Sequence, residues 1–106
     1  MSTVTDLTTE TFADAIKEPG LTVVDFWAPW CGPCRQMAPQ FEKAAALRPD
    51  YRFTKVNIDD EPALAQAFEV RSIPTLAVIK DGQLLGMAPG AVAADQLIEA
   101  LDRVAA

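Results

Sequence analysis

Two cysteines, Cys31 and Cys34, are the only thiols in this 106-residue chain, and two residues separate them. This spacing lets both sulfurs approach bonding distance on one helical turn. They follow a mostly apolar, β-rich run at 21–27 and open a helical pattern at 34–47, which places them at a helix N-terminus. Unpaired N–H groups and the helix dipole stabilise a thiolate there, and a thiolate attacks disulfides. The pair therefore predicts thiol–disulfide exchange.

Two other uses of a cysteine pair remain open. Structural zinc needs four Cys or His ligands, and a chain with two Cys and no His could supply only half of a site shared between two copies. A structural disulfide would close a loop too short to restrict the unfolded chain much, and such bonds are rare in the cytosol. A Cys-x-x-Cys motif beside a β-α-β pattern is instead typical of redox proteins.

One acidic residue, Asp25, interrupts the apolar run between Val24 and Phe26. Burial disfavours its charged form and would raise its pKa. Because the chain has no histidine, Asp25 is the best candidate for a general base. The alternative is an ordinary carboxylate at the solvated end of a strand.

Helices and strands alternate along the sequence, and Asp81-Gly82 predicts a hairpin turn between the last two strands. Parallel strands joined by helices need cover on both sheet faces, so we expect a three-layer α/β fold. The expected helices are 9–17, 34–47, one beginning at 59–62, and 94–104; the expected strands are 21–27, 51–58, 75–80 and 83–87.

Length and composition fit one domain over residues 1–106, with half of the residues hydrophobic and a net charge of -6. This negative charge argues against nucleic-acid binding, and no run of about 18 apolar residues predicts a membrane span. The segment Met1–Asp6 has no positive charge and precedes no apolar stretch, so it does not read as a signal peptide. A cytoplasmic protein is the simplest expectation, although a mature chain that had lost a leader would look the same.

The segment Val24–Arg35, which reads VDFWAPWCGPCR, closely resembles the active-site signature of the thioredoxin family. The resemblance continues at 55–59, 70–76 and 80–82, at thioredoxin spacing over nearly the whole chain. It implies a thioredoxin fold, with a central mixed sheet of about five strands and four helices in three α/β/α layers, in a monomer.

The resemblance also implies roles for individual residues. Cys31 would be the nucleophile, with the more exposed sulfur, and Cys34 the resolving cysteine. Asp25 would move the proton of Cys34, through water, and Lys55 would be its partner rather than an ordinary surface lysine. Trp27 is ambiguous between a core residue and a shield for the cysteines.

A flat apolar patch around Cys31 would bind partners, and Pro74 matches the family's cis-proline. The alternative for Pro74 is a proline that merely begins a strand. Pro89 stands where the family commonly has Val, which puts partner preference in doubt, and Ala93 stands where a Ser often caps the helix. The residues of this predicted docking patch are Trp30, Gly32, Pro33, Ile73, Pro74 and Gly90.

The leading functional hypothesis is a protein-disulfide reductase whose own disulfide is reduced again by a thioredoxin reductase. NADPH and FAD belong to that partner, because this chain shows no Rossmann glycine fingerprint and needs no bound cofactor. One alternative is a disulfide oxidant or isomerase, although Gly32 and Pro33 add no group that would further stabilise a thiolate. The other is a binding subunit that leaves its thiols idle.

Overall fold

Nine elements alternate in a computed structural model that describes residues 3–106, so Met1 and Ser2 of the N-terminal segment lie outside the described part. In chain order they are β1 (Thr5–Asp6), α1 (Thr9–Lys17), β2 (Leu21–Trp27), α2 (Gly32–Leu47), β3 (Arg52–Asn57), α3 (Pro62–Ala67), β4 (Thr75–Lys80), β5 (Gln83–Pro89) and α4 (Ala94–Ala105).

The five strands form one mixed sheet in the order β1-β3-β2-β4-β5. Strand β3 is parallel to both β1 and β2, whereas β4 is antiparallel to β2 and to β5. The predicted three-layer α/β arrangement is confirmed. The periodicity did not predict β1, because two residues are too few to show a pattern.

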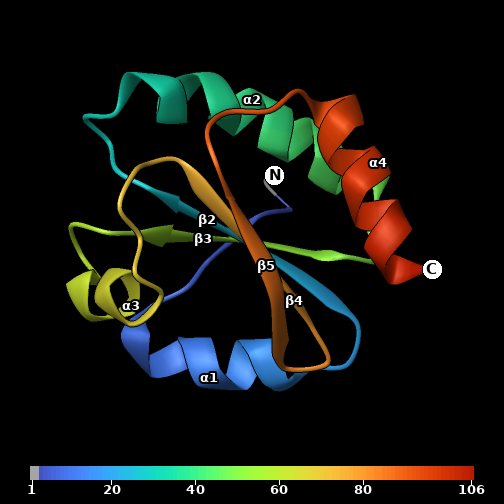
Figure 1. Cartoon of the computed structure of the whole chain (residues 1–106), viewed down its shortest axis with the longest axis horizontal. Helices are drawn as coiled ribbons and strands as arrows, with labels where there is room; N and C mark the ends of the chain where they lie inside the picture. The colour runs from blue at the N-terminus through green and yellow to red at the C-terminus, as the bar shows by residue number, and fades with distance from the viewer. Residues whose placement is uncertain (1–2) are drawn as a thin grey trace.

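Helices cover both faces of the sheet, as Figure 1 shows, with α2 and α4 on one face and α1 and α3 on the other. Strand β2 lies between two cores because its side chains alternate in direction. Val23 packs with Phe41 and Leu101 on the α2/α4 face, whereas Val24 packs with Phe12 and Leu64 on the α1/α3 face. This double burial explains why β2 reads as a continuous apolar run, apart from its Asp.

The β4–β5 hairpin turns at Asp81 and Gly82, whose φ angles of 51° and 84° suit the two-residue turn that the sequence predicted. Strand β5 is an exposed edge strand. Beyond its end, Gly90 N donates to Pro74 O over 2.8 Å. Because bonding alternates along an antiparallel pair, the nitrogen of Pro89 faces away from β4, so its missing N–H breaks no ladder bond.

Three helices begin in different ways. Thr8 caps α1 with a capping box, and the sulfur of Cys31 accepts from Cys34 N at the start of α2. Helix α4 has no side-chain cap at Ala93, but Ala94 N donates to the Gln40 side chain of α2 over 2.8 Å. A residue from another helix thus supplies the acceptor that the local sequence lacks.

Among the described residues, no helix is long and apolar enough to cross a membrane.

Candidate active site

The cysteines form a disulfide at the N-terminus of α2, with their Cα atoms 5.2 Å apart. Cys31 precedes the helix and Cys34 lies in its first turn, where Cys34 N donates to Cys31 Sγ over 3.1 Å. This contact places a backbone dipole on the sulfur that would become the thiolate. Cys31 is 5% exposed and Cys34 3%, so the expected difference in exposure is small in the disulfide form.

Behind Cys34 lies a small cavity of about 60 Å³, which Asp25 also lines. Asp25 belongs to β2 and is 1% exposed, and its Oδ1 has no hydrogen-bond partner among the described residues. Burial raises the pKa of Asp25 to about 6, although the positive charge of Lys55 lowers it in part. The cavity has room for water beside a carboxylate that titrates near neutral pH, which is what proton relay from Cys34 requires.

Trp27 at the end of β2 and Lys55 of β3 also line this cavity. Lys55 is the register partner of Asp25 in the parallel β2–β3 pair. The Lys55 Nζ lies 4.4 Å from the centroid of the Trp27 ring, a cation–π distance. Trp27 is half-buried and packs against the cysteine cluster, so it is both a core contact and a cover for the cysteines.

The other predicted site residues converge on Cys31 from three segments. Ile73 O lies 3.7 Å from Cys31 Sγ, and the Ile73–Pro74 peptide bond is cis. Gly90 lies beside this peptide bond, because its backbone N–H donates a hydrogen bond to Pro74 O. A Cβ built on Gly32 would meet nothing within 4 Å, so the approach to the disulfide is open there. Pro33 is exposed in the first turn of α2.

Asp59 is a site residue that the sequence interpretation missed. Trp30 is 65% exposed, and its ring is held by a 2.9 Å hydrogen bond from Nε1 to Asp59 Oδ2. Asp59 follows β3 and belongs to an acidic run that reads as a helix start, which concealed this contact. Only its place in the family-like segment 55–59 offered a signal.

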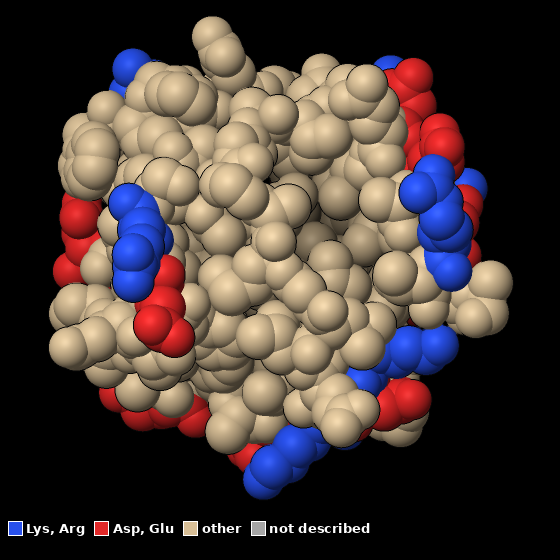
Figure 2. Space-filling view, in the orientation of Figure 1, with Lys and Arg blue, Asp and Glu red and all other residues tan. Residues whose placement is uncertain are grey.

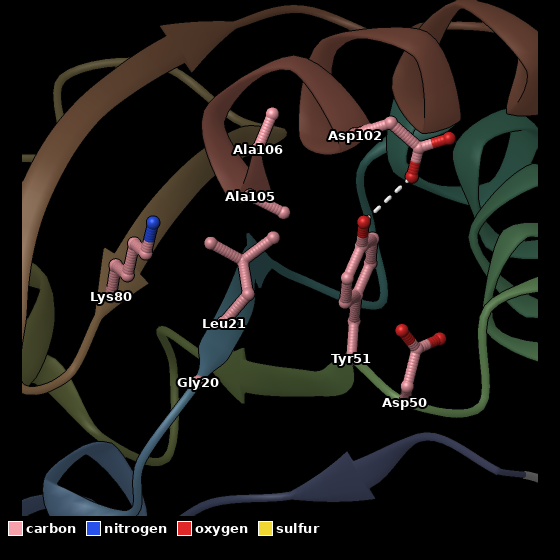
Figure 3. Close-up of a pocket in the computed structure, with 8 residues that line it drawn as sticks. All are labelled: Gly20, Leu21, Asp50, Tyr51, Lys80, Asp102, Ala105 and Ala106. Carbon is pink, nitrogen blue, oxygen red and sulfur yellow. Dashed lines mark hydrogen bonds between the residues drawn. The ribbon is translucent and has the colours of Figure 1, made fainter.

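A larger hollow of about 450 Å³ lies at the opposite end of β2, where Leu21 begins the strand (Figure 3). Its polar lining includes Tyr51 and Asp102, whose side chains are hydrogen-bonded over 2.7 Å. This hollow is remote from the disulfide and contains no thiol. Among residues 3–106, no group of three or more His, Cys, Asp or Glu is placed to hold a metal ion.

Comparison with known proteins agrees with this geometry. A family model named Thioredoxin matches residues 3–103. Thioredoxin 1 of Synechococcus elongatus is 43% identical over 105 residues, covering 97% of this chain and 98% of that protein. A Staphylococcus aureus thioredoxin is 44% identical over 94 residues, covering 85% and 88%. The crystal structure of oxidised mitochondrial thioredoxin 3 from Saccharomyces cerevisiae superposes with a TM-score of 0.86 at 39% identity, covering 94% of each chain.

Proposed function

We propose, from the premise that the chain belongs to the thioredoxin family and is a thiol–disulfide oxidoreductase, that it reduces protein disulfides in the cytoplasm with electrons from NADPH. A flavin-containing thioredoxin reductase would deliver those electrons, so NADPH and FAD remain with that partner. The observation that supports this function best is the Cys31–Cys34 disulfide at a helix N-terminus, beside a cavity that holds a buried carboxylate.

In the proposed cycle, the Cys31 thiolate of the reduced protein attacks one sulfur of a target disulfide. A mixed disulfide forms, and the other target sulfur leaves as a thiolate. Cys34 then loses its proton and attacks Cys31 Sγ, which releases the second target thiolate. The protein is left with the Cys31–Cys34 disulfide, the state seen in the structure. Two electrons have passed to the target.

Asp25 is proposed to accept the proton of Cys34 through water in their shared cavity. Its support is the geometry of the cavity together with a pKa near 6, which leaves most of the carboxylate ionised at neutral pH. Lys55 is proposed as a positioning residue that limits the rise in this pKa. Burial makes Asp25 a stronger proton acceptor than an ordinary aspartate, and the charge of Lys55 helps to keep this carboxylate ionised at neutral pH.

The patch around Cys31 is proposed to dock target proteins. Trp30 offers an exposed ring held by Asp59, and Ile73 with Pro74 places a backbone edge beside the sulfur. Apolar area and backbone contacts are shared by many partners, so such a patch suits a reductase with several targets.

NADPH consumption tests this function with oxidised protein, a bacterial thioredoxin reductase and insulin as the disulfide substrate. We expect rapid turnover that Cys31→Ser abolishes. Trp30→Ala should slow insulin reduction while dithiothreitol still reduces the Cys31–Cys34 disulfide at the normal rate. If no turnover occurs with protein that dithiothreitol reduces normally, the proposed reductase coupling is wrong.

A further inference from the structure

An uncharged groove runs between β5 and α4, with a volume of about 420 Å³. Its floor is Leu76 and Val78 of β4, and Ala100 and Val104 belong to its α4 wall. None of its lining residues is charged, although the chain as a whole has a net charge of -6. In Figure 2 the hollow is surrounded by uncharged side chains, and the charged ones lie near the edges of the view and in one group on the left of this face.

The groove is open because β5 presents almost no side chain toward α4. Gly86 and Ala88 are the register partners of Val78 and Leu76, so they lie on the face that α4 covers. Gly86 has no left-handed φ, and a Cβ built on it would meet nothing within 4 Å. Neither the backbone nor the packing of this chain therefore requires glycine there, and glycine weakens a strand.

The groove is continuous with the docking patch. Its upper end is formed by Gly90, Ala91 and Val92, and Gly90 N is bonded to Pro74 O over 2.8 Å. Ile73, which precedes Pro74, places its carbonyl oxygen 3.7 Å from Cys31 Sγ. Because an extended chain advances about 3.3 Å per residue, a segment held at Cys31 reaches the groove within a few residues.

We propose that this groove binds apolar side chains of the target protein, in the segment that flanks the cysteine attacked by Cys31. The inference rests on the proposed reductase function and adds a substrate preference to it. Charged side chains are excluded, because the groove would remove them from water without offering a partner. Gly86 keeps the groove open in place of a residue that would fill it.

The test uses two synthetic peptides, each with one cysteine in a mixed disulfide with glutathione. One has alternate leucines on both sides of its cysteine, and the other has threonine in their place. Each reaction converts the protein dithiol to the Cys31–Cys34 disulfide and releases peptide thiol and glutathione, so electrons and protons balance. We expect wild type to reduce the leucine peptide with about tenfold higher kcat/KM, as burial of part of one or two leucines implies.

Two variants fill the groove from opposite walls, Gly86→Val from β5 and Ala100→Phe from α4. In both we expect the two peptides to be reduced at equal rates. Leu84→Thr is the matched control, because Leu84 lies on the same edge strand but lines a different hollow, with Ile16 and Phe68. It should keep the preference. Thermal unfolding of each variant confirms that it is folded.

Equal rates for the two peptides in wild type would overturn the inference and leave the reductase function standing. A preference that survives in folded Gly86→Val and Ala100→Phe would also overturn it. Failure of wild type to reduce either peptide or insulin would instead overturn the proposed function, and the inference with it.

Discussion

Asp25 in β2 and Asp102 in α4 have the same side chain, yet their pKa values differ greatly. Burial raises the pKa of Asp25 to about 6, with Lys55 lowering it in part. Hydrogen bonds from Arg48 and Tyr51 lower the pKa of Asp102 to about 2. Each carboxylate has a basic residue nearby, so the presence of a cation alone does not explain the difference.

Hydrogen bonding separates the two groups. Asp102 accepts from Arg48 Nε and Nη2 over 2.9 and 2.7 Å, and from Tyr51 OH over 2.7 Å. These bonds tie α4 to the end of α2 and the start of β3. Asp25 Oδ1 has no partner among the described residues and faces a cavity beside Cys34. The satisfied carboxylate joins elements, whereas the unsatisfied one is free to exchange a proton.

Replacing the buried Asp25 carboxylate is expected to have the largest effect, and this effect is on catalysis. Asp25→Asn removes the proposed base and should slow the attack of Cys34 on a Cys31 mixed disulfide by about 100-fold at pH 7. Wild type should show a rate that rises with pH through about 6, and the variant should lack that inflection. Single-turnover kinetics between pH 5 and 8 measure both. An unaltered profile would refute the proton-transfer role.

The same substitution should stabilise the fold. The pKa of Asp25 is higher in the folded state, so its ionisation opposes folding: the cost is absent below about pH 3.8, grows as pH rises and levels off above about pH 6. Asp25→Asn should therefore raise the free energy of unfolding of the disulfide form by about 3 kcal/mol at pH 8. At pH 3.5 the gain should vanish. Urea unfolding at the two pH values measures it, and a gain independent of pH would contradict the argument.

Lys55→Met tests the comparison further, because it removes the positive charge that acts on the Asp25 carboxylate. Because the charge of Lys55 lowers the pKa of Asp25, its loss should move the inflection in the pH–rate profile above pH 6. Lys80→Met is the matched control, since Lys80 Nζ donates to Val104 O in α4, away from the cavity. An inflection that stays in place in Lys55→Met would show that this lysine does not act on Asp25.

The smallest effect is expected at Asp102. Asp102→Asn weakens partly exposed interactions with Arg48 and Tyr51 and should lower the thermal midpoint by less than about 5 °C at pH 7, with no loss of insulin reduction. Its lowered pKa stabilises the fold above about pH 3.8, and this contribution is lost as pH falls through about 2. The difference from wild type should therefore disappear near pH 2. Slower insulin reduction by Asp102→Asn would show that this carboxylate also affects the redox site, contrary to the comparison.

Local patterns in the sequence determined most of the elements and the reactive pair. The bounds of α1, β2 and β4 agree with the predicted ranges, because apolar periodicity and Pro or Gly breakers act within a few residues. Helix α2 begins at Gly32 rather than Cys34, since Cys31 itself caps the helix. The placement of two thiols at a helix start likewise needs no long-range information.

Tertiary structure alone decided the surroundings of these residues. The two-residue β1, the bond from Ala94 N to Gln40 and the hold of Asp59 on Trp30 each join segments that are distant in sequence. The choice between a solvated and a buried Asp25 also depended on packing. Burial, cavities and electrostatic neighbours are properties of segments brought together by the fold, so no local pattern encodes them, and they set the pKa on which the proposed chemistry depends.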